Sequence, residues 1–173
     1  GDEYLTSPID PRPKFHLYKP HIAILTGIAW DHINVFPTFD NSVDQFRKFV
    51  DTMEIQGRLI YYGGDEILND IAQNCRQDLI VFPYKTPKYV IRNGITYVKT
   101  GKDEVALKIF GEHNLQNMEA ARLACRQIGI MDDKFYEAIS DFTGASNRLQ
   151  KIVEKPDRVA FKDFAHSPSK LKA

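Results

Sequence analysis

An aspartate and a histidine stand close to the point where a buried apolar segment ends. Residues 21–28, HIAILTGI, form a continuous apolar run with β-branched side chains, and Asp31 and His32 follow shortly after it. A neutral imidazole nitrogen binds divalent metals, and a neighbouring carboxylate can share the coordination. The alternative is a polar end to a buried strand, because strand ends often carry such residues. Taken alone, the pair is compatible with both interpretations.

A second cluster lies in GEHNLQNMEAA, residues 111–121. Asn114 and Asn117 are three residues apart, so they share one face of a helix at its start. Gly111 and the pair formed by His113 and Asn114 would let a ligand approach the positive end of this helix. Two carboxamides there can read the donor and acceptor edge of a nucleobase. The alternative is that Asn114 is only the helix cap.

Two further segments carry polar groups in loops. Arg148 lies in SNRLQ, where a guanidinium can bind a phosphate or a carboxylate through two hydrogen bonds, although a solvated arginine fits equally. Asp163 and His166 in KDFAHSP follow the last apolar segment, where catalysis and a strand-to-helix turn are both compatible with the pattern. The sequence contains no G-x-x-x-x-G-K-[ST] phosphate loop and no Ser-His-Asp or Cys-His arrangement at a recognisable spacing.

The composition is that of one globular domain and excludes several classes of partner. Of the 173 residues, 43% are hydrophobic, and 23 lysines and arginines balance 23 aspartates and glutamates. This balance gives no electrostatic reason to expect binding to nucleic acid or to an anionic membrane. Cys75 and Cys125 form neither a metal clip nor a disulfide framework. No apolar run reaches the length of a membrane span, so we expect a cytoplasmic protein.

The hydrophobic pattern predicts the elements that would position these residues. Three apolar runs predict strands, at residues 21–28, 57–64 and 78–84. Two segments between them carry apolar residues at helical spacing, residues 41–53 and 65–75. Asn41 and Asp65 are the expected N-caps of these helices. The alternation predicts an α/β fold with a mostly parallel sheet and helices on both faces.

The rest of the chain predicts a small antiparallel part and two more helices. Asn93-Gly94, between two short apolar segments of residues 88–101, is a strong hairpin signal, and residues 104–111 would extend that sheet. Two helices are expected next, at residues 112–130 and 132–144. A loop over residues 145–157 and a last strand from residue 158 would follow. Residues 1–20 contain four prolines and are expected to be irregular and extended.

In their order along the chain, these segments resemble the Mur ligases, the ATP-dependent amide ligases of bacterial peptidoglycan assembly. The resemblance runs through DEY, WDHINVF, GEHNLQNMEAA, NRLQ and DFAHSP. It implies that residues 1–163 form the family's central ATP-binding domain, of the P-loop type and truncated at its N-terminus. Residues 164–173 would begin the C-terminal ligase domain. The phosphate loop and a metal-binding glutamate would lie before Gly1, so we expect this fragment to be inactive alone.

The branch of the family that the opening segment resembles joins UDP-N-acetylmuramate to the tripeptide L-alanyl-γ-D-glutamyl-meso-diaminopimelate. DEY and WDH before VFPTF carry this likeness. The implied reaction, in cell-wall synthesis and recycling, consumes ATP with Mg²⁺ and passes through an acyl phosphate. Ligation of L-alanine to UDP-N-acetylmuramate is the second assignment. A non-catalytic nucleotide-binding module is a further alternative, whereas folylpolyglutamate synthetase has a different signature around its Asp-His pair.

The resemblance also implies which residues contact the nucleotide. Asn114 and Asn117 would lie at the adenine, with His113 beside them. Asp163 would reach the ATP ribose, near the hinge to the C-terminal domain.

Three residues would act at the phosphates and the reacting groups. His32 would be a ligand of a magnesium ion near the γ-phosphate, Arg148 would contact that phosphate, and His166 would lie close to the reacting groups. Asn147 and Gln150 stand where the family often has an arginine and a glutamate around Arg148.

Overall fold

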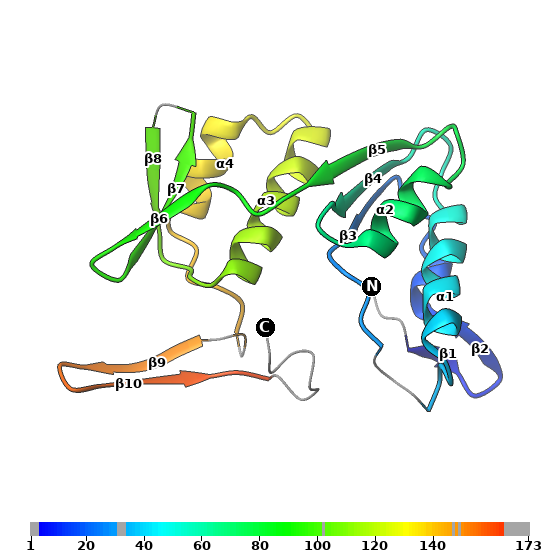
Figure 1. Cartoon of the computed structure of the whole chain (residues 1–173), viewed down its shortest axis with the longest axis horizontal. Helices are drawn as coiled ribbons and strands as arrows, with labels where there is room; N and C mark the ends of the chain where they lie inside the picture. The colour runs from blue at the N-terminus through cyan, green and yellow to red at the C-terminus, as the bar shows by residue number, and fades with distance from the viewer. Residues whose placement is uncertain (1–3, 31–33, 102, 147, 149, 165–173) are drawn as a thin grey trace. The chain divides into compact units, whose positions relative to one another are not determined.

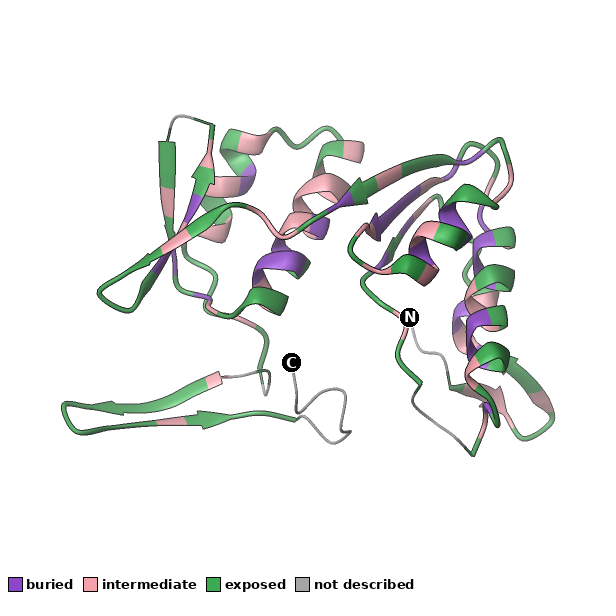
Figure 2. Ribbon diagram, viewed as in Figure 1, coloured by how far each residue is buried: buried purple, intermediate pink, exposed green. Residues whose placement is uncertain are grey.

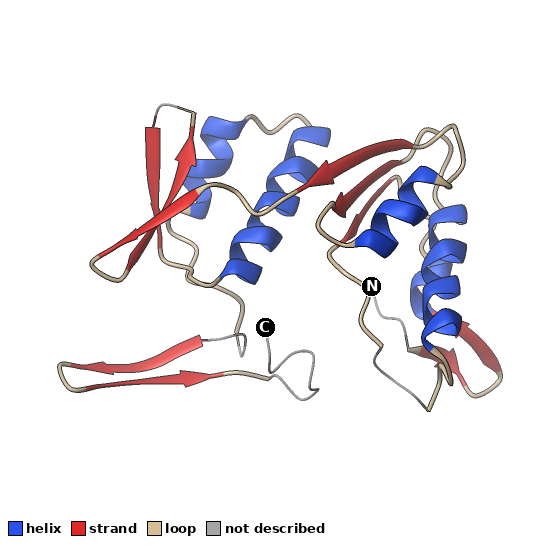
Figure 3. Ribbon diagram, viewed as in Figure 1, coloured by secondary structure: helices blue, strands red, loops and turns tan. Residues whose placement is uncertain are grey.

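The chain forms two compact units that mix helices and strands, as expected for an α/β protein (Figures 1 and 3). The computed structural model describes residues 4–30, 34–101, 103–146, 148 and 150–164. Unit 1 contains Gly1–Lys85 and Leu123–Gly129, and unit 2 contains Thr86–Arg122 and Ile130–Ala173. Within the described residues, no helix is both long and apolar enough to cross a membrane.

Unit 1 is built on a three-stranded parallel sheet in the order β3-β4-β5. Its strands and connecting helices are β3 (Ile22–Leu25), α1 (Phe39–Asp51), β4 (Arg58–Tyr62), α2 (Glu66–Gln73) and β5 (Ile80–Tyr84). Ile24 lies opposite Ile60 in the register, and Ile60 lies opposite Phe82. The predicted β-α-β-α-β alternation is therefore confirmed, and it brings the carboxyl ends of three strands to one edge of the sheet.

The core of unit 1 lies where alternate residues of the sheet meet the apolar stripes of both helices (Figure 2). The cluster consists of Phe15, Ala23, Leu25, Val43, Phe49, Val50, Met53, Leu59, Tyr61, Leu68, Ile71, Ala72 and Leu79. Residues two apart in a strand point to the same face, which is why Leu59 and Tyr61 enter this core together. Full burial of one such side chain contributes about 2 kcal/mol, so this cluster holds the unit together.

The N-terminal segment is more ordered than the sequence predicts. β1 (Leu5–Ser7) and β2 (Asp10–Pro13) form an antiparallel pair, and a 3₁₀ turn, η1 (Lys14–Leu17), follows. A two-stranded ribbon tolerates prolines because the N–H that they lack can face solvent. Phe15 of η1 then packs on Phe46 and Phe49 of α1, with ring centroids 5.3 and 5.1 Å away.

The caps of the first two helices were predicted with mixed success. α1 begins after Thr38, whose Oγ1 accepts a hydrogen bond from the Asn41 N–H at 3.1 Å, so the prediction that Asn41 is the cap is wrong. Both residues can cap a helix, and the helix simply extends further toward the N-terminus than its apolar stripe indicates. The Asp65 prediction is confirmed, because its Oδ1 accepts from the N–H groups of Ile67 and Leu68 at 2.9 and 3.1 Å.

Unit 2 contains a three-stranded antiparallel sheet of β6 (Tyr89–Arg92), β7 (Ile95–Thr100) and β8 (Asp103–Leu107). Asn93 and Gly94 join the first two strands with φ angles of 52° and 76°. Positive φ at both positions is the requirement of a type I′ turn, so the predicted hairpin is confirmed.

The remaining elements of unit 2 are two helices and a hairpin, α3 (Glu112–Gln127), α4 (Asp132–Ile139), β9 (Gln150–Lys155) and β10 (Arg158–Lys162). α3 starts in unit 2, and its last residues are grouped with unit 1. The expected loop over residues 145–157 is wrong for β9, which pairs antiparallel with β10. β9 is almost entirely exposed and therefore lacks the apolar alternation that identifies a strand in a sequence.

Candidate functional site

The start of α3 brings the residues of the HNLQN segment onto a helix, as predicted. Gly111 precedes the helix with a φ of +84°, a conformation that favours glycine. Asn114 is the third residue of α3, and its Nδ2 donates a hydrogen bond to the Phe110 carbonyl at 2.8 Å. A capping side chain would instead accept a bond from a helix N–H. Asn114 is therefore not the cap of α3.

A partly buried polar network anchors the first turn of this helix within unit 2. The Glu112 carboxylate accepts hydrogen bonds from Thr86 Oγ1 at 2.9 Å and from Gln116 Nε2 at 3.4 Å. Gln116, which is 9% exposed, also donates to Thr86 Oγ1 at 2.9 Å. The network thus ties the start of α3 to the first residue of the unit.

A cavity of about 310 Å³ lies within unit 2 at the start of α3. It is lined by Lys108, Ile109, Phe110, Asn114, Thr143, Gly144, Arg148, Gln150 and Lys151. Its volume is at the lower end of the range of about 300 to 1,000 Å³ for small-molecule pockets. The fold thus brings together Asn114 and Arg148, two of the predicted site residues that are far apart in the sequence.

The three cations that line this cavity differ in their partners. Lys108 donates to Asp141 Oδ1 at 2.6 Å, and this hydrogen bond lowers the pKa of the Asp141 carboxyl. Lys151 pairs with Glu154 at 2.9 Å. Arg148 has no carboxylate partner among the described residues, and its guanidinium carbon lies 5.9 Å from the centre of the Phe164 ring. Arg148 therefore keeps a positive charge available for an anion.

The other predicted nucleotide residues that the structure describes do not line the cavity. His113 and Asn117 are exposed on α3, and Asp163 is exposed directly after β10. Sequence reasoning missed Phe110 and Gly144, which do line it. Gly144 has a φ of +97°, so the glycine that follows Thr143 was the available signal for a tight turn at this point.

Asp31 and His32, at the end of the first parallel strand, lie outside the described residues, as does His166. The structure describes both flanks of the Asp31-His32 pair. Asp65 Oδ2 accepts from the Ile28 N–H at 3.1 Å, and Trp30 Nε1 donates to the Phe36 carbonyl at 3.0 Å. Asn34 Nδ2 donates to the Tyr4 hydroxyl at 3.0 Å. Hydrogen bonds therefore hold the described residues on either side of the pair.

The magnesium site predicted at His32 stays a prediction. Within the part of the chain that the structure describes, no group of three or more histidine, cysteine, aspartate or glutamate side chains is placed to hold a metal.

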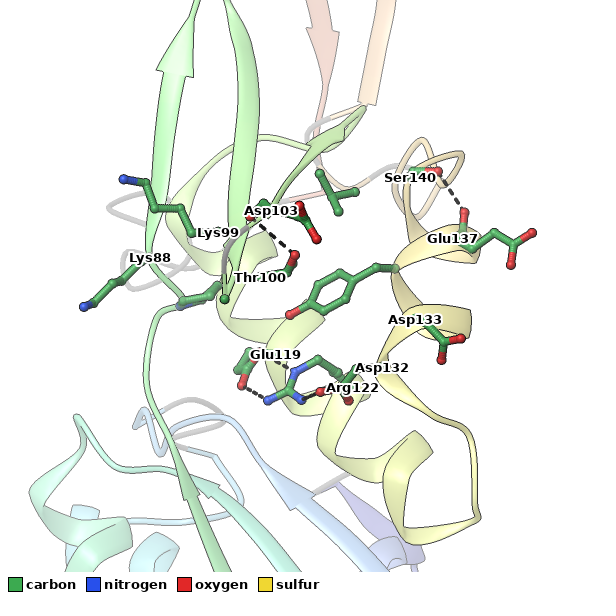
Figure 4. A pocket seen from close by; sticks show the side chains of 14 residues that line it. Lys88, Lys99, Thr100, Asp103, Glu119, Arg122, Asp132, Asp133, Glu137 and Ser140 are labelled. Atoms are coloured by element: carbon green, nitrogen blue, oxygen red, sulfur yellow. Dashed lines mark hydrogen bonds and ion pairs between the residues drawn. The ribbon is translucent and has the colours of Figure 1, made fainter.

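A larger hollow of about 910 Å³ in unit 2 contains none of the predicted site residues (Figure 4). Its main charged group is Arg122 of α3, whose side chain is 13% exposed. Arg122 donates to both carboxylate oxygens of Glu119, at 2.9 and 2.5 Å, and to Asp132 Oδ2 at 2.8 Å. The bonds to Glu119 raise the pKa of Arg122. Arg122 thus joins two carboxylates, one on α3 and one on α4, so these contacts form a structural junction between the two helices.

Comparison with known proteins supports the fold and identifies the family. The family model for the Mur ligase middle domain matches residues 12–125, more than half of the chain. UDP-N-acetylmuramate–L-alanine ligase from Caldicellulosiruptor bescii is 28% identical over 171 residues. That match covers 92% of this chain and 38% of the relative, so the chain spans well under half of the relative's length.

Two solved structures show the same fold. The first is UDP-N-acetylmuramate:L-alanyl-gamma-D-glutamyl-meso-diaminopimelate ligase from Neisseria meningitides, with 25% identity and a TM-score of 0.70 over 84% of this chain and 47% of that one. The second is MurF ligase from Thermotoga maritima in complex with ADP, with 15% identity and a TM-score of 0.74 over 90% of this chain and 38% of that one. The chain belongs to the Mur ligase family, and residues 12–125 are the part that matches its middle domain.

Proposed function

We propose that this chain supplies the nucleotide-binding residues of an ATP-dependent amide ligase of peptidoglycan synthesis or recycling. The enzyme would join UDP-N-acetylmuramate to L-alanyl-γ-D-glutamyl-meso-diaminopimelate through an acyl phosphate, releasing ADP. One observation carries the proposal. Arg148, a cation with no carboxylate partner among the described residues, lines the same cavity as the amide of Asn114. A nucleoside triphosphate presents a hydrogen-bonding base and an anionic chain, which need these two kinds of group.

The adenosine part of ATP would lie at the start of α3. Asn114 would contact the adenine, and Asn117 and His113, both exposed on the same helix, would lie next to it. Asp163, exposed after β10, would accept hydrogen bonds from the ribose hydroxyls. The positive end of the α3 dipole, which follows a glycine, also favours an anionic ligand.

The phosphates would be bound by charge. Arg148 would contact the γ-phosphate and stabilise the negative charge that develops during phosphoryl transfer. His32 would be a ligand of Mg²⁺, which when bound neutralises phosphate oxygens. His166 would lie near the reacting groups.

Ligation of L-alanine to UDP-N-acetylmuramate is the second candidate. The Caldicellulosiruptor bescii relative bears that name, and its identity to this chain is slightly higher than that of the tripeptide ligase of known structure.

The test is an assay of phosphate release by the full-length ligase that contains residues 1–173, because this fragment alone is expected to be inactive. The assay supplies ATP, Mg²⁺, UDP-N-acetylmuramate and either acceptor. We expect turnover with the tripeptide and little with L-alanine. Preference for L-alanine would establish the second candidate, and phosphate release that needs no UDP-N-acetylmuramate would contradict both.

Two substitutions connect the assay to the cavity. Arg148→Ala should lower kcat by about a hundredfold, the effect of losing about 3 kcal/mol of charge stabilisation. Asn114→Ala should raise the KM for ATP by about tenfold, as expected for a lost base contact. Arg158→Ala and Asn74→Ala are matched controls, since both residues are exposed and neither lines the cavity. Unchanged kinetics in Arg148→Ala would exclude this arginine from the site.

A further inference from the structure

The first strand of the parallel sheet in unit 1 has an open edge. Within the described residues, β3 pairs with β4 alone, so it lies at one end of the order β3-β4-β5 (Figure 1). The Arg58 N–H donates to the His21 carbonyl at 2.8 Å, which fixes the side of the chain that faces β4. In a parallel strand, alternate residues turn their N–H and C=O groups to opposite sides. The backbone groups of Ile22 and Ile24 therefore point away from β4.

An apolar groove of about 400 Å³ lies against this strand and is lined by all four of its residues. The other walls include Phe15 and Tyr18, from η1 and the residue after it, and Phe46 and Phe49 of α1. None of the nine lining residues is charged. Tyr18 is 60% exposed and Ile24 is 39% exposed, although Ile24 lies within a strand. Apolar side chains beside open backbone groups form a surface that proteins normally cover.

The chemistry of the groove fits an added β-strand. Such a strand would donate to the carbonyl groups of Ile22 and Ile24 and accept from their N–H groups. Its alternate side chains would point to the two faces of the sheet. On one face they would meet Phe46 and Phe49, which pack with the core of unit 1. On the other face they would lie beside the Ile24 side chain. We therefore expect a strand that is apolar on both faces, as in a buried parallel sheet.

We propose that a further β-strand of the same polypeptide, from residues outside 1–173, completes the sheet at β3. The match with the Caldicellulosiruptor bescii relative covers 92% of this chain but 38% of the relative, so most of that relative has no counterpart here. A tethered strand has a high effective concentration, which favours pairing over a short edge. The uncharged groove resembles a divided domain core more than a transient interface. This completion of the sheet does not depend on the proposed activity, because it follows from β3 and its groove alone.

The test is amide hydrogen exchange in the purified full-length ligase that contains residues 1–173, measured at single residues by mass spectrometry. The amides of Ala23 and Leu25 face β4 and are the internal controls. We expect the amides of Ile22 and Ile24 to exchange as slowly as these controls. An open edge would make them exchange at least about tenfold faster, as expected for one missing hydrogen bond each, and would overturn the proposal.

A photo-crosslinker identifies the added strand. Tyr18→p-benzoylphenylalanine keeps an aromatic side chain at the groove and should crosslink within one molecule to a segment outside residues 1–173. Tyr89→p-benzoylphenylalanine is the matched control, because Tyr89 is an exposed aromatic residue of unit 2 that does not line the groove. It should not crosslink to that segment. Crosslinks from position 18 that stay within residues 1–173 would contradict the proposal.

A charge placed at the edge should disturb the added strand. In the full-length ligase, Ile24→Lys should raise the exchange rate of the Ile22 amide about tenfold, the effect of one lost hydrogen bond. Ile55→Lys is the matched control, because Ile55 is 78% exposed and lies outside the groove. An unchanged Ile22 rate in Ile24→Lys would contradict the added strand.

A second copy of the chain is the competing occupant of the groove. A strand of the same polypeptide protects the Ile22 and Ile24 amides equally at every protein concentration. Pairing between two copies would instead make this protection decrease on dilution and would give crosslinks between molecules. Either result would overturn the proposal. The exchange pattern and its concentration dependence are measured on the unsubstituted ligase, so they do not depend on how well any variant folds.

Discussion

Two helices of the molecule, α2 and α3, begin in opposite ways. At the start of α2, the Asp65 carboxylate accepts hydrogen bonds from the N–H groups of Ile67 and Leu68. Its other oxygen accepts from the Ile28 N–H, in the segment that follows β3. α3 is preceded by Gly111, which has no side chain that could cap the helix.

The difference lies in the caps: a side-chain anion occupies the first donors of α2, whereas the residue before α3 is a glycine. The donors of α2 are occupied by an internal anion, so this helix start serves to hold the loop after β3. The donors of α3 lie beside a cavity lined by Asn114 and by Arg148, which has no carboxylate partner among the described residues. A site for an external anion is therefore expected at α3 and not at α2.

The largest effect is expected from removing the internal anion of α2. Asp65→Ala deletes three hydrogen bonds, two at the helix cap and one to Ile28, and should lower the free energy of unfolding by about 2 kcal/mol. Urea denaturation measures this loss, and amide hydrogen exchange at Ile28 should become faster. Asp65→Asn keeps a capping oxygen and should lose about half as much. An unchanged midpoint in Asp65→Ala would mean that α2 does not depend on its cap.

A smaller loss of stability is expected from removing the hydrogen bonds that tie the start of α3 to Thr86. Thr86→Val keeps the shape of the side chain but removes an acceptor from the buried Gln116 amide and a donor to Glu112. The unfolding free energy should fall by about 1 kcal/mol. Thr100→Val is the control, because the Thr100 hydroxyl forms one exposed hydrogen bond among the described residues, to the Asp103 carbonyl at 3.4 Å. Equal stability losses in the two variants would contradict a structural role for the buried network.

The smallest change in stability is expected at a buried hydroxyl group in unit 1 that forms no hydrogen bond with the described residues. Tyr84, at the end of β5, is 3% exposed, and its hydroxyl has no hydrogen-bond partner among the described residues. Tyr84→Phe should therefore leave the free energy of unfolding unchanged or raise it by less than about 1 kcal/mol. Thermal denaturation at neutral pH measures this change, and a clear loss of stability would reveal a partner for the hydroxyl.

The same tyrosine predicts a dependence on alkaline pH. Burial raises the pKa of Tyr84 from 10.0 to about 12. Between these values the unfolded chain releases the tyrosine proton and the folded chain keeps it, so the stability that is complete below pH 10 falls as the pH rises toward 12. Tyr84→Phe should remove this part of the pH dependence. Identical stability profiles for both proteins between these pH values would contradict the raised pKa.

Much of this fold could be predicted because its signals are local. The alternation of apolar runs and helical segments predicted the parallel sheet. Asn93-Gly94 predicted the hairpin, and Asp65 predicted the start of α2. The β9-β10 hairpin could not be found in this way, because its exposed strands bury too little apolar surface to leave a periodic pattern. The cap of α1 was misplaced because Thr38 and Asn41 are chemically equivalent candidates.

The candidate site was only partly predictable. Asn114 and Arg148 were predicted to be site residues from their motifs, and the tertiary structure shows that they line one cavity. Phe110 carries no polar group and was missed, since an aromatic residue before a glycine normally indicates core packing. The orientation of the Asn114 amide depends on one carbonyl of the preceding turn, which no sequence pattern encodes.

The most direct test of this account is a titration of the isotope-labelled polypeptide with ATP, followed by amide NMR. We expect the largest chemical-shift changes at residues 111–114 and at the Arg148 side chain, with the Ile67 and Leu68 amides unaffected because Asp65 already occupies them. Shift changes that cluster at the start of α2, or that leave the start of α3 unmoved at saturating ATP, would contradict the central claim that α3 offers an open nucleotide site.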